Sequence, residues 1–174
     1  MKLPSPPSIT IQNVQRNVLF SARKLQGFAA IACKLVWQIR RPKSEIASLK
    51  QIYVPLVSDR RMAALHKEFC GIPGATDVLT FQHGEIVISA DTALAQARIF
   101  HTSVTSEIQL YLLHGLLHLA GFDDMTPSKR RQMHQLQKKL MTTILRSSRY
   151  NHAIQGAAVC DMRETAVRKP MYNR

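Results

Sequence analysis

The sequence is poor in cysteine, in acidic residues and in long apolar runs. Its three cysteines, Cys33, Cys70 and Cys160, are widely spaced and form no CxxC pair, which argues against a disulfide framework and a cysteine-based zinc finger. The two most apolar stretches, 28–37 and 110–122, contain polar residues and are too short to span a bilayer. Prolines interrupt the start of the chain, where an export signal would need an apolar run. We therefore expect a cytoplasmic protein with free thiols and no membrane partner.

The charge is unevenly distributed along the chain. The 24 Lys and Arg residues outnumber the 11 Asp and Glu residues, for a formal net charge of +13. Residues 1–45 carry +7, residues 46–124 carry −3 and residues 125–174 carry +9. Basic flanks around a mildly acidic centre suit a polyanion that lies across a site holding a cation. A solvated basic protein without a nucleic-acid role is the alternative that charge alone leaves open.

The chain has the size and apolar content of one folded domain, with 174 residues of which 45% are hydrophobic. Apolar periodicity and turn residues predict strands at 9–14, 46–57, 77–81 and 85–89, the last two forming a hairpin. They predict helices at 20–37, 60–69, 90–100 and 106–120, and a last one from Pro127. We expect an α+β fold with a mixed four-stranded sheet and about five helices over residues 1–148. Residues 149–174 are expected to form a flexible basic C-terminal tail.

Two details of the second strand and the second helix can also be predicted. Pro55 makes the strand at 46–57 irregular or places it at an edge of the sheet. Asp59 is expected to cap the helix at 60–69, with Phe69 among its inward-facing residues.

A candidate metal site lies in the predicted helix at 106–120. His114 and His118 are four residues apart, so both rings lie on one helical face and can converge on one ion. Gly121 allows the chain to turn back in a left-handed conformation, which brings Asp124 into position as third ligand. Two nitrogens and one oxygen leave coordination positions open, which indicates catalysis more often than a structural role. The alternative is a core helix whose two histidines are satisfied by hydrogen bonds.

Gly115 bears on the kind of chemistry. A glycine inside a helix costs about 1 kcal/mol relative to alanine, so we expect something to need close access at this position. In H-E-x-x-H metallopeptidases the same position holds the glutamate that acts as general base. Peptide hydrolysis by that route is therefore disfavoured. Glu107 and Tyr111 share the helical stripe of the two histidines and are candidates for supporting the ligands, with buried packing as the alternative for Tyr111.

Residues 114–123, HGLLHLAGFD, resemble the hallmark H-G-x-L-H-L-x-G-[YF]-D of the YbeY family of single-domain bacterial endoribonucleases. The blocks TDVLTF at 76–81 and GEIVIS at 84–89 are similar to that family's T-D-V-L-S-F and G-D-I-x-I-S segments. The resemblance implies one zinc ion per chain held by three histidines, His114 being also catalytic. It implies cleavage of single-stranded RNA in 16S rRNA 3′-end maturation and in ribosome quality control. The implied partners are the 16S rRNA precursor and the small ribosomal subunit, with a ribosomal protein and a ribosome-associated GTPase, and no small-molecule ligand.

Two positions depart from the family pattern. Asp124 stands where the family has its third histidine, which shifts preference toward harder metals, so that another divalent cation could replace zinc. Cys70 stands where the family has an arginine thought to contact the RNA phosphate, and a thiol cannot make a guanidinium's bidentate contact. Three interpretations stay open. Arg60, Arg61 or Lys67 substitutes for the family's arginine, phosphate binding is weaker, or Cys70 is an additional or alternative metal ligand.

Three functions are compatible with these residues. The first is a metal-dependent endoribonuclease, in which Asp123 or Glu107 could orient the ligands. The second, motivated by Cys70 and Asp124, is a ribosome-associated binding factor that has lost much of its nuclease activity. The third is a metallopeptidase, against which Gly115 weighs.

Overall fold

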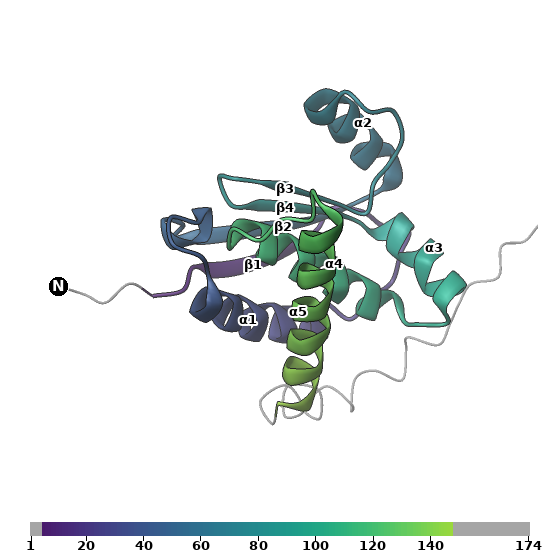
Figure 1. The fold of residues 1–174 in the computed structure, drawn as a ribbon. Helices are drawn as coiled ribbons and strands as arrows, with labels where there is room; N and C mark the ends of the chain where they lie inside the picture. Colours follow the sequence, from purple (N-terminus) through teal and green to yellow (C-terminus); the bar gives the residue numbers. More distant parts are fainter. Residues whose placement is uncertain (1–4, 148–174) are drawn as a thin grey trace, which may run out of the picture.

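A four-stranded mixed sheet lies at the centre of the structure, a computed structural model that describes residues 5–147 (Figure 1). Its strands are β1 (Ser8–Asn13), β2 (Gln51–Val57), β3 (Val78–Phe81) and β4 (Glu85–Ser89), in the order β1-β2-β4-β3. β2 is parallel to both β1 and β4, whereas β3 and β4 form an antiparallel hairpin. The predicted mixed sheet is confirmed. The predicted tail lies outside the described residues, and its boundary stays a prediction.

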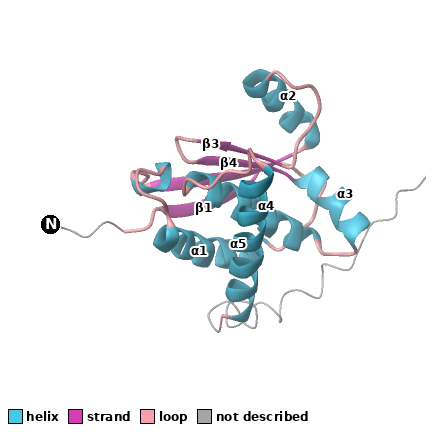
Figure 2. Ribbon diagram, viewed as in Figure 1, coloured by secondary structure: helices cyan, strands magenta, loops and turns pink. Residues whose placement is uncertain are grey.

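Five α-helices of the described part of the chain pack around the sheet, as expected (Figure 2). They are α1 (Ala22–Ile39), α2 (Asp59–Cys70), α3 (Ala90–Phe100), α4 (Val104–Leu119) and α5 (Pro127–Arg146), with a short 3-10 helix at Glu45–Ala47. Within residues 5–147, none of the helices is long and apolar enough to cross a membrane.

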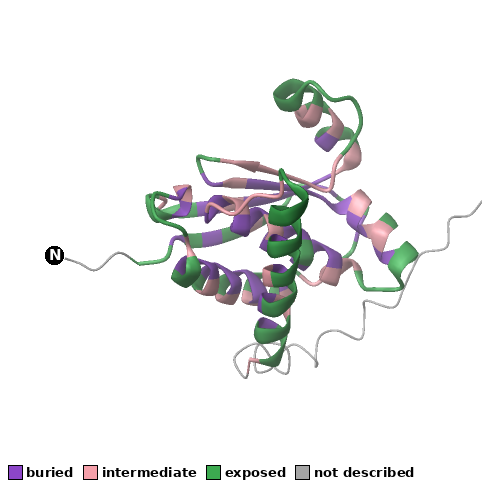
Figure 3. Cartoon of the chain, viewed as in Figure 1, coloured by how far each residue is buried: buried purple, intermediate pink, exposed green. Residues whose placement is uncertain are grey.

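The main core lies between one face of the sheet and the helices α1 and α4. Alternate residues of β2, Ile52, Val54 and Leu56, point into it and are completely buried. α4 is buried along most of its length (Figure 3) because α1, α3, α5 and the sheet all contact it. This explains why its sequence is apolar on almost every side. The helix that carries His114 and His118 is therefore central to the fold, as expected.

The opposite face of the sheet is only partly covered, by α2 (Figure 1). Met62 of α2 packs there against Val57 of β2 and Val87 of β4, and these three residues form a second, much smaller core cluster. One face of the sheet therefore builds the stable core, while the other has room for a pocket beneath α2.

The prediction for the second strand is partly wrong. The strand begins at Gln51, and the residues before it form the 3-10 helix and a turn. Pro55 does not mark an edge, because β2 lies between β1 and β4. Tyr53 donates its N–H to the Gly84 carbonyl at 2.9 Å. The backbone nitrogen of Pro55, two residues later, is directed toward the same neighbouring strand, β4. The β2–β4 pairing resumes only at Leu56, so the missing N–H of proline falls in a gap of the ladder.

Two expectations for α2 are also wrong. Ser58 caps the helix by accepting the Arg61 N–H, whereas Asp59 is its first residue and accepts a hydrogen bond from Thr92 Oγ1 at 2.7 Å. Asp59 thus ties α2 to the start of α3. Phe69 is 58% exposed, because its ring borders the open pocket beneath α2 instead of packing into a filled core.

Candidate metal centre

The candidate ligands lie at the end of α4 and in the turn that follows it. His114 Nε2 is 3.0 Å from His118 Nε2. Asp124 places its two carboxylate oxygens 3.8 Å from His114 Nε2 and 4.0 Å from His118 Nε2. Among the residues that the structure describes, these three form the one group of potential ligand atoms close enough to share an ion. The sequence prediction of this trio is consistent with the geometry.

The arrangement fits a small divalent cation. Bonds of 2.0–2.1 Å in a tetrahedral site place neighbouring ligand atoms about 3.3 Å apart. The observed separations of 3.0 to 4.0 Å lie within ~0.7 Å of that value. The ligand side chains are 23–36% exposed, so an ion held by these three donors would have one side open to solvent. Such an open position is typical of catalytic sites.

The turn after α4 brings Asp124 back toward the helix. Gly121 has φ +86°, a conformation that L side chains rarely adopt. The turn is held by Arg41, which donates its N–H to the Ala120 carbonyl and whose guanidinium lies 4.8 Å from the Phe122 ring centre. Asp123 is not part of the group of potential ligand atoms and pairs with Lys129 at 3.0 Å. Asp123 therefore secures the turn rather than contacting a histidine.

Gly115 serves the packing of α4 on the sheet. A Cβ at this position would lie 2.6 Å from Ile86 Cγ2 and 2.9 Å from Thr80 Oγ1. Close access is needed here, as expected, but it is the sheet that approaches. Because these neighbours hold α4 against β3 and β4, the glycine sets how near the two histidines lie to the β3 edge.

Gln137 of α5 is a site residue that the sequence did not reveal. Its side chain is buried, and its Nε2 donates to the Leu110 carbonyl at 3.0 Å. The same side chain also raises the pKa of His114, which is the effect of an amide oxygen that accepts a ring N–H. A ring N–H engaged in this way would leave the other nitrogen of His114 unprotonated and able to bind a metal ion. A glutamine within the apolar stripe of Met133, Leu140 and Ile144 was the only sequence signal.

The environment keeps His114 neutral. Burial lowers the pKa of His114, and the neighbouring His118 lowers it further, although Gln137 and Asp124 act in the opposite direction. A neutral imidazole is the form that binds a metal ion. Tyr111 and Glu107 are buried on the same stripe, and Glu107 accepts a hydrogen bond from Thr102 Oγ1. Burial, followed by the charges of Glu107 and Asp77, raises the pKa of Tyr111.

Two clefts meet at His114. The first, called here the metal cleft, has a volume of about 600 Å³ and is lined by His114, His118, Asp77, Cys70 and residues of β3. The second, the α5 cleft, has about 590 Å³ and is lined by His114, Gln137, His134 and Lys138. Among the described residues, no lysine or arginine lines the metal cleft, whereas Lys138 lines the α5 cleft.

The structure separates the remaining candidate residues. Cys70 is exposed and lines the metal cleft, but it does not belong to the group of potential ligands. Arg60, Arg61 and Lys67 are exposed on α2 and do not line the metal cleft. Arg61 instead borders the pocket between α2 and the sheet. Contact of these three residues with RNA stays a prediction.

Comparison with known proteins identifies relatives over most of the described chain. The sequence model of the family described as Endoribonuclease YbeY matches residues 10–145. Endoribonuclease YbeY of Beutenbergia cavernae is 34% identical over 136 residues, covering 68% of this chain and 87% of that protein. Endoribonuclease YbeY of Anaeromyxobacter sp. strain Fw109-5 is 41% identical over 100 residues, and the match spans about half of each protein, 52%. The solution structure of TM1509 from Thermotoga maritima has a TM-score of 0.58 at 26% identity and covers 84% of this chain and 95% of that one.

Proposed function

The chain belongs to the YbeY endoribonuclease family, and we propose that it is a metal-dependent hydrolase that cleaves single-stranded RNA. Its proposed role is 16S rRNA 3′-end maturation and ribosome quality control in the cytoplasm, with the rRNA precursor and small subunit as partners. The observation that carries the proposal is the open His114–His118–Asp124 group. It lies in a chain whose basic ends suit a polyanionic substrate.

Zinc, one ion per chain, is the proposed cation, and Asp124 makes a harder divalent metal the alternative. A divalent cation in such a site supplies Lewis acidity toward a phosphate oxygen and lowers the pKa of a coordinated water. The chain's own residues prepare the site for it. The two imidazoles provide nitrogen donors, Asp124 offsets one positive charge, and Gln137 is placed to orient the His114 ring.

Substrate binding is proposed to rest on the basic surface of α5. Lys138 lines the α5 cleft together with His114, so a phosphate held by its ammonium group lies next to the metal ligand. This position differs from that of Cys70, which is in the metal cleft on the other side of His114. Lys138 of α5 would thus replace the arginine that the family has at the position of Cys70, and the affinity for RNA would depend on the salt concentration.

Peptide hydrolysis is disfavoured by space as well as by sequence. The general base of the H-E-x-x-H enzymes would occupy position 115. Any side chain there would begin with a Cβ 2.6 Å from Ile86 Cγ2, so the present packing of α4 has no room for a glutamate.

A second candidate function is a ribosome-associated binding factor with weakened nuclease activity. The observation that favours it is the metal cleft itself, which has Cys70 and, among its described lining residues, no arginine or lysine. Without a guanidinium at that place, phosphate binding close to the cation is weaker. In this case, a ribosomal protein and a ribosome-associated GTPase would be the partners that matter most.

The test is cleavage of an end-labelled single-stranded RNA by the wild-type protein and by His118→Ala, with a duplex of the same sequence and casein as further substrates. We expect the single strand alone to be cut, and the substitution to lower the rate at least 100-fold. Folding of the variant is checked by circular dichroism. Equal cleavage by both proteins would contradict the proposal. A gain of tenfold or more in Cys70→Arg would favour the binding factor.

A further inference from the structure

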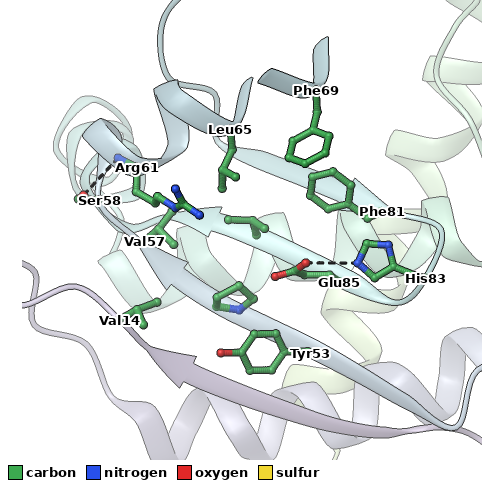
Figure 4. A pocket seen from close by; sticks show the side chains of 12 residues that line it. Val14, Tyr53, Val57, Ser58, Arg61, Leu65, Phe69, Phe81, His83 and Glu85 are labelled. Atoms are coloured by element: carbon green, nitrogen blue, oxygen red, sulfur yellow. Dashed lines mark hydrogen bonds and ion pairs between the residues drawn. The ribbon is translucent and has the colours of Figure 1, made fainter. Parts of the chain in front are cut away.

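The pocket between α2 and the open face of the sheet has no assigned role. It has a volume of about 580 Å³ and is lined by residues of α2, β2, β4 and the β3–β4 hairpin (Figure 4). Hydrophobic side chains form its floor, with Val57 and Val87 at the centre. Unlike the two clefts at His114, it contains none of the candidate metal ligands.

Three aromatic rings form a row along one side of this pocket. The centres of Phe69 and Phe81 are 5.0 Å apart with an edge-on geometry, and Phe81 stacks on His83 at 5.6 Å. Phe69 is 58% exposed and the His83 side chain 69% exposed. Exposed aromatic rings at the rim of an apolar pocket favour a flat, apolar ligand that can stack on them.

The charged groups of the pocket are separated. Arg61 lies at the end away from His83 (Figure 4). Glu85 lies beneath the aromatic row and pairs with His83 at 3.3 Å. A carboxylate there disfavours a phosphate but can accept hydrogen bonds from the amino and ring N–H groups of a nucleobase. The pocket therefore suits bases in its interior and a phosphate only beside Arg61.

The β3–β4 hairpin connects this pocket with the metal cleft. Val78, Thr80 and Gln82 line the metal cleft, whereas Phe81 and His83 line the pocket beneath α2. Neighbouring residues of β3 and of the turn that follows it thus border two binding spaces. A strand of nucleic acid that crosses this edge would reach both.

We propose that the pocket beneath α2 binds one or two unpaired bases of an RNA strand whose neighbouring phosphodiester lies in the metal cleft. The inference rests on the proposed function and adds a physical source for its single-strand preference. Stacking on Phe69 and Phe81 requires a base whose face is free, and the bases of a duplex are stacked on one another.

The test compares Phe69→Ala with Phe100→Ala. Both residues are phenylalanines in the last turn of a helix, 58% and 64% exposed, but only Phe69 lines the pocket. Binding of a fluorescein-labelled 12-nucleotide oligouridylate is measured by anisotropy in the presence of a chelator, and again with a 12-residue abasic RNA. We expect Phe69→Ala to bind the oligouridylate about 5- to 20-fold more weakly, the effect of losing one base–aromatic stack. Phe100→Ala should bind like the wild type.

The abasic strand separates stacking from other effects. Phe69→Ala should bind it as the wild type does and keep the wild-type salt dependence, because no charge is removed. Equal weakening for both RNAs, or no weakening for either, overturns the inference. Unchanged RNA binding with an altered oligomeric state would assign the pocket to a second copy of the chain and overturn it as well. If Phe69→Ala binds RNA normally while the wild type still shows metal-dependent cleavage, the inference fails but the proposed function stands.

Discussion

Replacing Gln137 by methionine tests whether α5 orients a metal ligand. Methionine keeps the length and volume of glutamine but removes both hydrogen bonds, one to the Leu110 carbonyl and one to His114. Groups that hold a ligating histidine in this way typically contribute 10- to 100-fold to metal affinity. We therefore expect the dissociation constant of the bound cation to rise by about that factor, or ~1.4–2.7 kcal/mol.

The effect on folding should be smaller than the effect on metal binding. An unpaired buried polar group costs about 1–3 kcal/mol, but the His114 side chain is 23% exposed, so water can replace part of the lost contact. We expect a loss of about 1 kcal/mol in the free energy of unfolding. A large loss of affinity with a small loss of stability distinguishes ligand orientation from general packing.

Affinity is measured by competition with a chromophoric chelator, and the spectrum of the cobalt-substituted protein reports the ligand geometry. The matched control is Gln135→Met, the same substitution at an exposed position of the same helix. The control should keep the affinity and spectrum of the wild type. If Gln137→Met also keeps both, the contact with His114 does not orient the ring and the reasoning fails.

Three further perturbations have outcomes that follow from single contacts. Gly115→Ala should destabilise the fold by about 1–2 kcal/mol in urea unfolding, because crowding against β3 and β4 outweighs the helical preference of alanine; a more stable variant would contradict this. Lys138→Gln should raise KM for RNA and reduce by about one the slope of the logarithm of the binding constant against the logarithm of the salt concentration. Lys139→Gln, on the same helix but lining no described pocket, serves as control. Burial raises the pKa of Cys33 to about 11, so at pH 8 only about one in a thousand of these thiols is ionised. Mass mapping after brief alkylation should find Cys70 modified and Cys33 unmodified, and Cys33 should react only as the pH approaches 11; rapid modification at pH 8 would be inconsistent with its burial.

Local sequence signals were sufficient to predict that His114, His118 and Asp124 lie together. The four-residue spacing of His114 and His118 and the glycine at position 121 are properties of one helix and its end, which depend on neighbours in the chain. The hairpin at 77–89 is equally local. For these segments the prediction and the structure agree, apart from the exact strand and helix ends.

Features set by distant partners could not be predicted. From the sequence, Pro55 indicates an edge strand. The structure accommodates it in a gap of the hydrogen bonding between β2 and β4, and this gap cannot be predicted before the order of the strands is known. Gln137 contacts Leu110, 27 residues away in sequence, and nothing in its own helix indicates that partner. Phe69 follows the apolar pattern of α2, yet it is exposed because its ring borders an open pocket rather than a filled core.

The most direct test of the account is a metal titration of RNA cleavage. Metal-stripped protein receives increasing amounts of zinc or manganese, and the initial rate of single-strand cleavage is measured at each step. The account predicts no cleavage without metal and a rise that reaches its plateau at one equivalent of cation per chain, with Asp124→Ala requiring at least tenfold more metal. Full activity of the metal-free protein, or the same titration curve for Asp124→Ala, would contradict the assignment of His114, His118 and Asp124 as the catalytic metal centre.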